Sequence, residues 1–310
     1  MLAQLLKNRR GSLLSLATTA LLLPVGAHAE GKTIAAAIAP VEAPLLSVSS
    51  FDDGILNLNQ WTISGNAPTL TTEVSRKGKY ALKSFLDRLK SEKSYRTELS
   101  LKGISAERGK DYWYGFSIYL PEDFVSDNIW EILAQWHGIP DEDLGESNEN
   151  LNPPLSLQST NGEWKLSSIW DSRQVTDKKN YEGKRSYKLG AYQRGAWTDW
   201  VFHIRWSPDS KGLLQVWQNG KKVVDTAGPI GFNDKRGPYF KLGIYKGWDD
   251  RYEPPGNVGV RTVYHDEIRV ASGPDATYAD VAPGGDSPAS TRRPLPPEGV
   301  AVESSLTANP

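Results

Sequence analysis

The sequence predicts an all-β protein, folded as a sandwich or jelly roll of two antiparallel sheets. Three observations support this prediction. Short segments of alternating apolar and polar residues recur between residues 46 and 271, which is the pattern of strands with one buried face. No long segment has the period of a helix. Turn signals such as Asn219-Gly220, the strongest short-range mark of a hairpin, separate the segments.

The composition determines how such a domain must be stabilised. The chain of 310 residues contains 11 Trp and 13 Tyr but no Cys. Disulfides, thiol nucleophiles and zinc–cysteine sites are therefore excluded, and a large hydrophobic core has to supply the stability. Aromatic side chains suit both such a core and a surface on which sugar rings stack.

The two ends of the chain differ from this domain. Residues 1–29 have a basic start, an apolar run and a small-x-small ending, the pattern of a secretory signal peptide. The apolar run is shorter than the ~20 residues of a membrane-spanning helix. We therefore expect a secreted or periplasmic protein, cleaved near Ala29 and not inserted in a membrane. Residues 30–45 are expected to be a linker, and the Pro/Ser/Ala-rich residues 272–310 a disordered tail.

The net charge limits the class of partner. It is −1 for the whole chain, and removal of residues 1–29, with three basic and no acidic residues, makes it −4. Nucleic acid is excluded as the main partner, since it calls for a basic domain. An anionic polysaccharide needs only a local basic groove and stays a candidate. The protein is expected to act as a monomer.

The strands are expected in a regular order along the domain. In residues 112–119 and 200–206 every even-numbered residue is aromatic or aliphatic, so these faces are expected in the core. Residues 213–225 form two strands around Asn219-Gly220. The remaining strands are expected at 79–86, 93–101, 130–137, 154–159, 163–170, 238–246 and 262–270.

Three of these strands carry polar residues opposite an apolar face. The strand at 130–137 is expected to bury Ile132, Ala134 and Trp136 and to turn Gln135 and His137 outward. By the same alternation, the other two strands turn outward Arg96 and Glu98, and Tyr239, Lys241 and Tyr245. Gly243 lies between the last two and leaves room for a ligand near the backbone. If the three strands are neighbours, one sheet face holds all of these groups.

These residue types suit proton abstraction from a carbon next to a carboxylate. His137 is a candidate base, and the Tyr245 phenol can donate or accept a proton. Arg96 and Gln135 can hydrogen-bond the carboxylate and stabilise the charge that develops on it. The set lacks the two uncommitted carboxylates that glycoside hydrolysis usually needs. Glu98 is expected to orient Arg96, or to form a surface ion pair with it.

The blocks "YRTELS", "AQWHG" and "YFKLGIYKG" occur in this order and resemble those of the β-jelly-roll polysaccharide lyases. The closer resemblance is to the heparin lyase I-like family, which also contains glucuronan lyases, and jelly-roll alginate lyases are more distantly similar. The segments 113–124 and 197–223 look like framework blocks of the same family, so the resemblance spans about residues 46–271. It implies a concanavalin-like jelly roll.

The resemblance also implies an activity, namely β-elimination on a 4-linked uronic acid that leaves a C4–C5 unsaturated sugar. His137 would be the base at C5 and Tyr245 the acid to the leaving oxygen, although with the other C5 epimer Tyr245 could take both roles. Gln135 and Arg96 would neutralise the carboxylate. The expected substrate-binding residues are Lys241, which matches a functional lysine of heparin lyases, together with Glu98, Tyr239 and Trp248.

The sequence leaves several substrates and several alternative functions open. After Tyr245, Lys246-Gly247 replaces the x-Gln of alginate lyases, and the net charge argues against heparin, so a glucuronan-like polymer is the first choice. An alginate or heparin-type lyase is the next. A jelly-roll glycoside hydrolase lacks its Glu-x-Asp-x-x-Glu strand here, and a non-catalytic carbohydrate-binding domain would not need a paired acid and base. No cofactor and no metal ligand are expected, although the acidic segment 141–150 leaves a structural calcium open.

Overall fold

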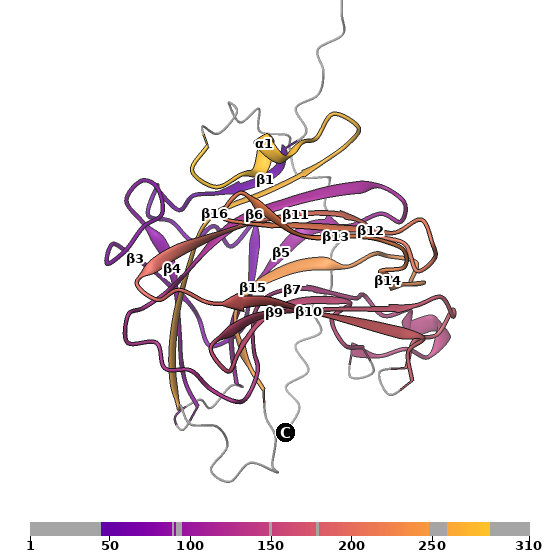
Figure 1. Ribbon diagram of the computed structural model, residues 1–310, viewed down its shortest axis with the longest axis horizontal. Coiled ribbons are helices and arrows are strands. Elements are labelled where there is room, and N and C mark those ends of the chain that lie inside the picture. Colours follow the sequence, from indigo (N-terminus) through magenta and orange to yellow (C-terminus); the bar gives the residue numbers. More distant parts are fainter. Residues whose placement is uncertain are drawn as a thin grey trace, which may run out of the picture. The chain divides into compact units, whose positions relative to one another are not determined.

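The computed structural model describes residues 45–88, 90, 95–148, 151–177, 180–247 and 259–285. Within them the chain forms two eight-stranded sheets, packed face to face (Figure 1). Every strand pair is antiparallel except β14 with β9. The predicted all-β jelly roll of two antiparallel sheets is therefore confirmed.

Sheet A has the order β13-β12-β11-β6-β16-β4-β3, with β1 also paired to β16. Its strands are β1 (Leu45–Ser49), β3 (Thr69–Thr71), β4 (Ala81–Asp87), β6 (Asp111–Leu120), β11 (Ala196–Arg205), β12 (Leu213–Gln218), β13 (Lys221–Ala227) and β16 (Val260–Ser272).

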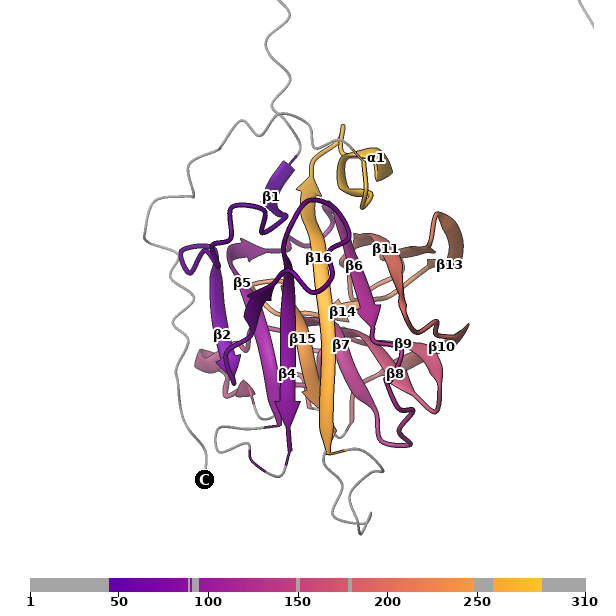
Figure 2. The same ribbon diagram turned by 90° about the vertical axis from the view of Figure 1, so that its left-hand side faces the viewer.

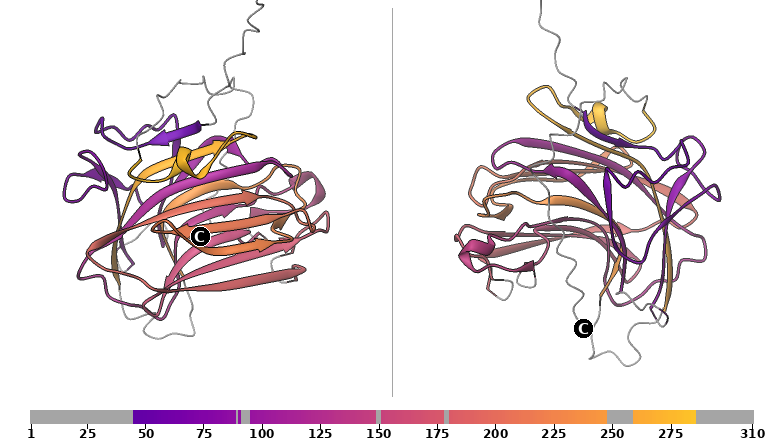
Figure 3. Two further views of the ribbon diagram at one scale, coloured as in Figure 1. Left: turned by 45° about the horizontal axis from the view of Figure 1, so that its top comes forward. Right: turned by 180° about the vertical axis from the view of Figure 1, so that it is seen from behind.

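Sheet B has the order β10-β9-β8-β7-β15-β5-β2, with β14 also paired to β9. Its strands are β2 (Trp61–Gly65), β5 (Arg96–Ser105), β7 (Glu131–His137), β8 (Leu155–Thr160), β9 (Glu163–Asp171), β10 (Gly183–Ala191), β14 (Gly231–Phe232) and β15 (Tyr239–Lys246). Figure 2 shows these strands running from β2 on the left to β10 on the right, and Figure 3 shows the two layers from two further sides.

The core lies between the sheets and is rich in aromatic rings. The even-numbered residues of 112–118 and 200–206 are buried, as predicted from the alternation. Trp136 of sheet B packs on Phe202 of sheet A, with ring centres 4.7 Å apart, and Phe116 packs on Phe240 at 5.5 Å. Each such side chain contributes about 2–3 kcal/mol by leaving water, so the core holds the sheets together without disulfides.

A bulge in β7 changes the predicted facing of one residue. Ala134 lies opposite Leu157 and Leu242, which are core residues, but Ile132 lies opposite Gln158 and Tyr245. Cross-strand partners share a face, so Ile132 lies on the outer face of sheet B and its predicted facing was wrong. The side chain is nevertheless buried, at 4% exposure. The extra residue of the bulge inverts the alternation at this point, and Leu133 joins the core instead.

Regular structure continues past residue 271, although we expected a disordered tail to begin at residue 272. A one-turn helix, α1 (Tyr278–Val281), follows β16 and packs on sheet A, where Val281 joins a small cluster with Val201 and Ala271. The short 3-10 helix η1 (Glu142–Leu144) follows β7. No helix in the described ranges is long and apolar enough to cross a membrane. The predicted signal peptide (1–29), residues 30–44 of the predicted linker and residues 286–310 of the predicted tail lie outside the described residues.

Candidate active site

Sheet B brings the three polar strands together, because β15 lies between β7 and β5. The strand register sets which side chains are neighbours. His137 lies opposite Tyr239, and Gln135 lies opposite Lys241. On the other side of β15, Glu98 lies opposite Gly243 and Arg96 opposite Tyr245. The predicted constellation required the three strands to be adjacent, and they are.

Glu98 is the centre of this constellation. Its carboxylate accepts a hydrogen bond from Gln135 Nε2 and forms an ion pair with Lys241 Nζ at 2.8 Å. All three residues are at most 3% exposed. The expectation that Glu98 orients Arg96 or pairs with it on the surface was wrong, because its two oxygens are committed to the neighbouring strands. Lys241 is likewise a buried cation, not a solvated one.

His137 is held in one tautomer by the backbone. Its Nδ1 lies 2.9 Å from the carbonyl oxygen of Gly138, which can only accept, so in the neutral ring Nδ1 carries the proton and Nε2 has the lone pair. Burial, together with the positive charge of Lys241, lowers the pKa of His137 to about 4. The imidazole is therefore neutral and able to accept a proton over the physiological pH range.

Arg96 and Tyr245 form a stacked pair at the other end of the site. The guanidinium carbon of Arg96 lies 4.4 Å from the centre of the Tyr245 ring, and Trp130 packs edge-on against the same ring at 5.6 Å. Within the described part of the chain, Arg96 Nε is buried and has no hydrogen-bond partner. An uncommitted buried N–H of a guanidinium favours an anionic ligand.

The two ends of the site lie on opposite sides of the Glu98 cluster. Tyr245 lies opposite Ile132, five residues from His137 along β7, which corresponds to ~16 Å between Cα atoms. Gln135 and Lys241 fill the interval. A ligand held over these two residues would therefore have the imidazole on one side and the phenol on the other.

Tyr239 is the second phenol of β15, and it is the one nearer to His137, with ring centres 5.8 Å apart. Burial, followed by the negative charge of Glu98, raises the pKa of Tyr239 to about 12. It therefore stays protonated at any physiological pH. Trp248, the remaining candidate for substrate binding, lies outside the described residues.

A buried ionic cluster behind Tyr245 was not predicted. Lys246 Nζ lies 2.7 Å from Asp127 Oδ2 and 3.0 Å from Glu131 Oε1, and Arg261 Nε lies 2.8 Å from Glu131 Oε2. The next residue, Gly247, donates its N–H to the carbonyl of Trp130, and a Cβ there would lie 2.7 Å from Trp130 Cε2. The Lys246-Gly247 pair thus anchors the end of β15 and leaves space for the ring that packs on Tyr245.

The other two histidines of the domain, His203 and His265, lie away from these groups. His203 stacks on Trp113 at 4.0 Å and contacts Gln215 and Asp111 on the outer face of sheet A. His265 is fully buried, and its Nε2 lies 2.9 Å from the carbonyl oxygen of Leu133. Neither lies on the outer face of sheet B.

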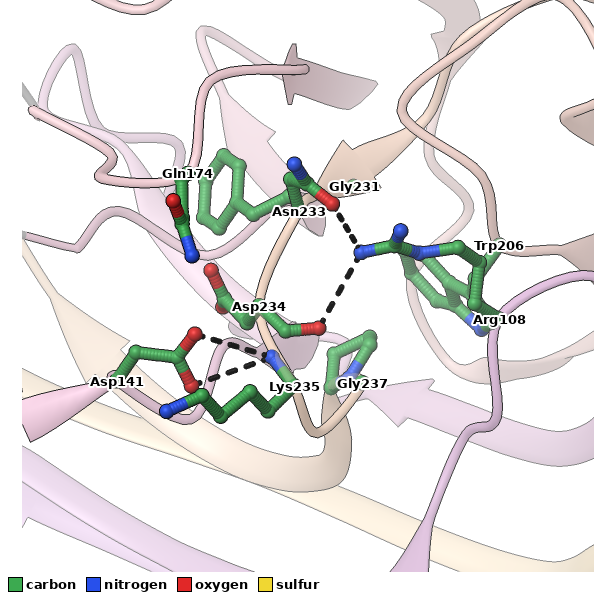
Figure 4. A pocket seen from close by; sticks show the side chains of 11 residues that line it. Arg108, Asp141, Gln174, Trp206, Gly231, Asn233, Asp234, Lys235 and Gly237 are labelled. Atoms are coloured by element: carbon green, nitrogen blue, oxygen red, sulfur yellow. Dashed lines mark hydrogen bonds between the residues drawn. The ribbon is translucent and has the colours of Figure 1, made fainter. Parts of the chain in front are cut away.

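A cavity of about 500 Å³ lies near the strand end that carries His137, but it contains none of the predicted site residues (Figure 4). It is lined in part by Arg108, Asp141, Trp206 and Asp234. Burial, with the nearby charges of Glu146 and Asp141, raises the pKa of Asp234 to about 8. In the described ranges, no group of three or more His, Cys, Asp or Glu side chains is arranged to hold a metal ion.

Comparisons identify several known proteins that are similar to this chain. A family model described as polysaccharide lyase matches residues 50–269. Heparin lyase I of Pedobacter heparinus is 32% identical over 97 residues, which are 29% of this chain and only 23% of that enzyme. An endo-β-1,4-glucuronan lyase from the fungus Trichoderma reesei superposes with a TM-score of 0.58 at 23% identity, covering 78% of this chain and 95% of that one. A family 7 alginate lyase gives a TM-score of 0.47 at 13% identity over 73% of this chain and 100% of that one.

Proposed function

The chain belongs to the polysaccharide lyase family, and on this premise we propose that it cleaves a 4-linked uronic-acid polysaccharide by β-elimination. The product would carry a C4–C5 unsaturated sugar at its new non-reducing end. The observation that carries the proposal is the single sheet face on which His137, the Glu98 cluster and the Arg96–Tyr245 pair lie in register. This face supplies a base, an acid and an anion-binding group together.

Arg96 would bind the carboxylate of the sugar whose C5 loses a proton. Its buried Nε has no partner in the described chain, and a carboxylate would satisfy it. Negative charge moves onto this carboxylate as the C5–H bond breaks, and a fixed cation stabilises that charge without reorganising. Gln135 has its amide N–H committed to Glu98, while its Oε1 has no partner among the described residues. We assign Oε1 to a sugar hydroxyl and the second N–H to the carboxylate.

His137 would be the base and Tyr245 the acid. His137 Nε2 takes the proton from C5, the electron pair forms the C4=C5 double bond, and the C4–O4 bond breaks. Tyr245 protonates the departing O4, and the partly exposed Arg96–Tyr245 pair gives it access to the substrate. This division of roles suits a sugar whose C5 proton and O4 lie on opposite sides of the ring. In the other C5 epimer the two lie on the same side, where one group can reach both, and Tyr245 would take both roles.

A glucuronan-like polymer is the substrate we place first. The chain has the fold of a fungal enzyme described as an endo-β-1,4-glucuronan lyase, which supports this choice through architecture alone. The net charge of −4 expected for residues 30–310 argues against a heavily sulfated polymer such as heparin. Gly247 in place of the Gln of alginate lyases argues against alginate. An alginate or heparin-type lyase of the same mechanism is the second candidate.

We further propose a secreted or periplasmic monomer that needs no metal cofactor. The support for export is the signal-like pattern of residues 1–29. The proposed proton transfers use only side chains, so dialysis against EDTA is expected to leave the rate unchanged. Loss of activity on EDTA treatment that calcium restores would contradict this and point to a structural calcium ion.

The experiment that tests the activity follows the ultraviolet absorbance of the unsaturated product. Residues 30–310 would be incubated separately with glucuronan, alginate and heparin, and both absorbance and reducing ends would be measured. Absorbance that rises with reducing ends, and most strongly on glucuronan, is the expected result. Reducing ends without absorbance would rule out elimination and leave hydrolysis.

A matched pair of variants tests the choice of phenol, because two tyrosines lie on the same face of β15. Tyr245→Phe is expected to lower kcat by about 10²–10⁴-fold, the range for loss of a general acid. Tyr239→Phe should keep most of the activity, since its raised pKa makes it a poor proton carrier. The reverse result would transfer the role to Tyr239, the neighbour of His137.

A further inference from the structure

The outer face of sheet B continues beyond the candidate active site, over β8, β9 and β10. The strand register extends the row of Tyr245 across these strands. Tyr245 lies opposite Ile132, Ile132 opposite Gln158, Gln158 opposite Lys165, and Lys165 opposite Lys188. We call Gln158, Lys165 and Lys188 the lysine row. Because cross-strand partners share a face, these side chains lie on the same face as Tyr245.

The alternation of neighbouring residues confirms this facing. Trp164 and Leu166, on either side of Lys165, are fully buried core residues, and Tyr187 and Leu189, on either side of Lys188, pack against the core. Lys165 and Lys188 therefore point away from the core. Figure 2 shows β8, β9 and β10 beside β7 and β15 in one sheet.

A second row, next to the first, consists of small side chains. Gln135 lies opposite Ser156, Ser156 opposite Ser167, and Ser167 opposite Ser186. These three serines lead directly from the Glu98 cluster toward the edge of the sheet. Short side chains in this row and long ones in the lysine row make a shallow step on the sheet surface, along which an extended chain can lie across the strands.

The two lysines have no charge partner in the described part of the chain. Neither makes an ion pair or a hydrogen bond there, in contrast to Lys241 and Lys246, which are both paired. Glu163 is the nearest acidic residue on the same face of β9, and it forms no ion pair with Lys165. Two uncompensated cations side by side repel each other and attract an anionic ligand.

The spacing of the row fits a uronic-acid polymer. Neighbouring strands lie about 4.8 Å apart, which is close to the length of one 4-linked pyranose unit. Lys165 is three strands from Tyr245, and Lys188 is four. A chain that crosses the strands from Tyr245 would therefore present the carboxylates of its third and fourth sugars to these lysines.

We propose that Lys165 and Lys188 form a distal subsite that binds carboxylates of the acidic polysaccharide three to four sugar units from the scissile bond. This inference rests on the proposed function for the class of substrate. Strands β8, β9 and β10 would then extend the substrate-binding surface, so that long polysaccharide chains bind more tightly than short ones. The two lysines act in binding and take no part in the proton transfers.

The test compares Lys165→Gln, Lys188→Gln and the double variant with a matched control, Lys221→Gln. Lys221 is exposed, lies on β13 of sheet A and likewise has no ion pair in the described residues. KM and kcat would be measured by ultraviolet absorbance on the polymer that the wild type cleaves and on its shortest cleavable oligomer. Retardation of each protein in gels containing glucuronan, alginate or heparin would be measured in parallel.

An exposed ion pair is worth up to about a fivefold change in affinity. We expect KM on the polymer to rise up to about fivefold for each single variant and about tenfold for the double variant, with kcat unchanged. The shortest oligomer and the Lys221→Gln control should show no change. The difference between wild type and double variant should also shrink as salt is added, because exposed charges are screened.

The outcomes separate the inference from the proposed function. Unchanged KM and unchanged gel retardation in the double variant, with an active wild type, would overturn the distal subsite and leave the lyase assignment intact. If the wild type cleaves no polymer but is retarded by one, and the double variant loses this retardation, the subsite stands and the proposed reaction fails. A wild type that neither cleaves nor binds any of the three polymers would overturn both.

Discussion

At the scale of single residues, Glu98 decides how the site is arranged. It joins three strands, because it lies on β5, accepts from Gln135 on β7 and pairs with Lys241 on β15. A buried charge of this kind is tolerated only while its partner is present. The carboxylate therefore acts on the site through its neighbours, by fixing the rotamers on which substrate binding depends.

Replacement of this carboxylate tests the arrangement. Glu98→Gln would leave Lys241 buried without a counter-ion, which costs about 3–5 kcal/mol of stability, and activity should fall with the misplaced Gln135. The double variant Glu98→Gln/Lys241→Met removes both charges, so its stability should recover while its activity does not. Urea denaturation and the absorbance assay measure the two effects. Asp225→Asn, which breaks the exposed pair with Lys222, is the control and should change little. Full activity in Glu98→Gln would contradict the assigned role.

The histidine base gives a second prediction at this scale. The pKa of His137 is about 4, lowered by burial and by Lys241, so the free enzyme should lose kcat/KM only as the pH falls through about 4. His137→Ala should lower the rate by about 10²–10⁴-fold across the profile. His203→Gln, on the other sheet, should keep the rate and the same acid limb. An acid limb near pH 6.5 would mean that His137 is solvated and not held as described.

At the scale of elements, β15 sets the positions of the site residues relative to one another. Gly243 allows this strand to pack close to β5. Gly243 has φ of +135°, and a Cβ at this position would lie 2.1 Å from the carbonyl oxygen of Thr97 on β5. Only glycine allows β5 to approach so closely while Lys241 and Tyr245 stay on the same face.

Gly243→Ala should therefore push β15 away from β5 and separate Tyr245 from Arg96. We expect a marked loss of stability and of kcat, read by thermal unfolding and by the absorbance assay. Gly190→Ala on β10 is the matched control, since Gly190 also has positive φ, +88°, but no atom within 4 Å of the added Cβ. If both variants lose the same activity, backbone strain alone is responsible and the close approach of the strands is not required.

Alternation along single strands was enough to predict the outward groups Arg96, Gln135, His137 and Tyr245, because a strand has a fixed period. It failed at Ile132, since a bulge is a local backbone event that changes the period without a mark in the sequence. Alternation along a strand also could not predict which side chains contact Glu98. These contacts depend on which strands are neighbours and on their register, which tertiary packing determines. The Lys246 cluster was missed for the same reason: a lysine in a strand looks solvated until its acidic partners are placed around it.

At the scale of the whole molecule, buried ionisable groups make stability depend on pH. His137 and His265 have folded pKa values of about 4, below the unfolded value of about 6.5. The unfolded state binds more protons between these values, so these two groups lower stability as the pH falls through this window. Asp234 and Asp266 have folded values of about 8 and about 7, raised mainly by burial. They act in the opposite direction, because the folded state then binds more protons, and stability falls as the pH rises from about 4 to 8.

The two effects oppose each other below pH 6.5, but above it both histidines are neutral in either state and only the carboxyl groups act. We therefore expect stability to decline between pH 6.5 and 8, with Asp234 contributing on the order of 1–2 kcal/mol. Asp234→Asn cannot ionise, so it should flatten this decline and raise the unfolding temperature at pH 8 by about 2–4 °C per kcal/mol. Thermal unfolding of both proteins from pH 5 to 8 measures this. A variant whose unfolding temperature stays parallel to that of the wild type would show that Asp234 is already ionised in the fold, balanced by a cation in the cavity that Arg108 borders.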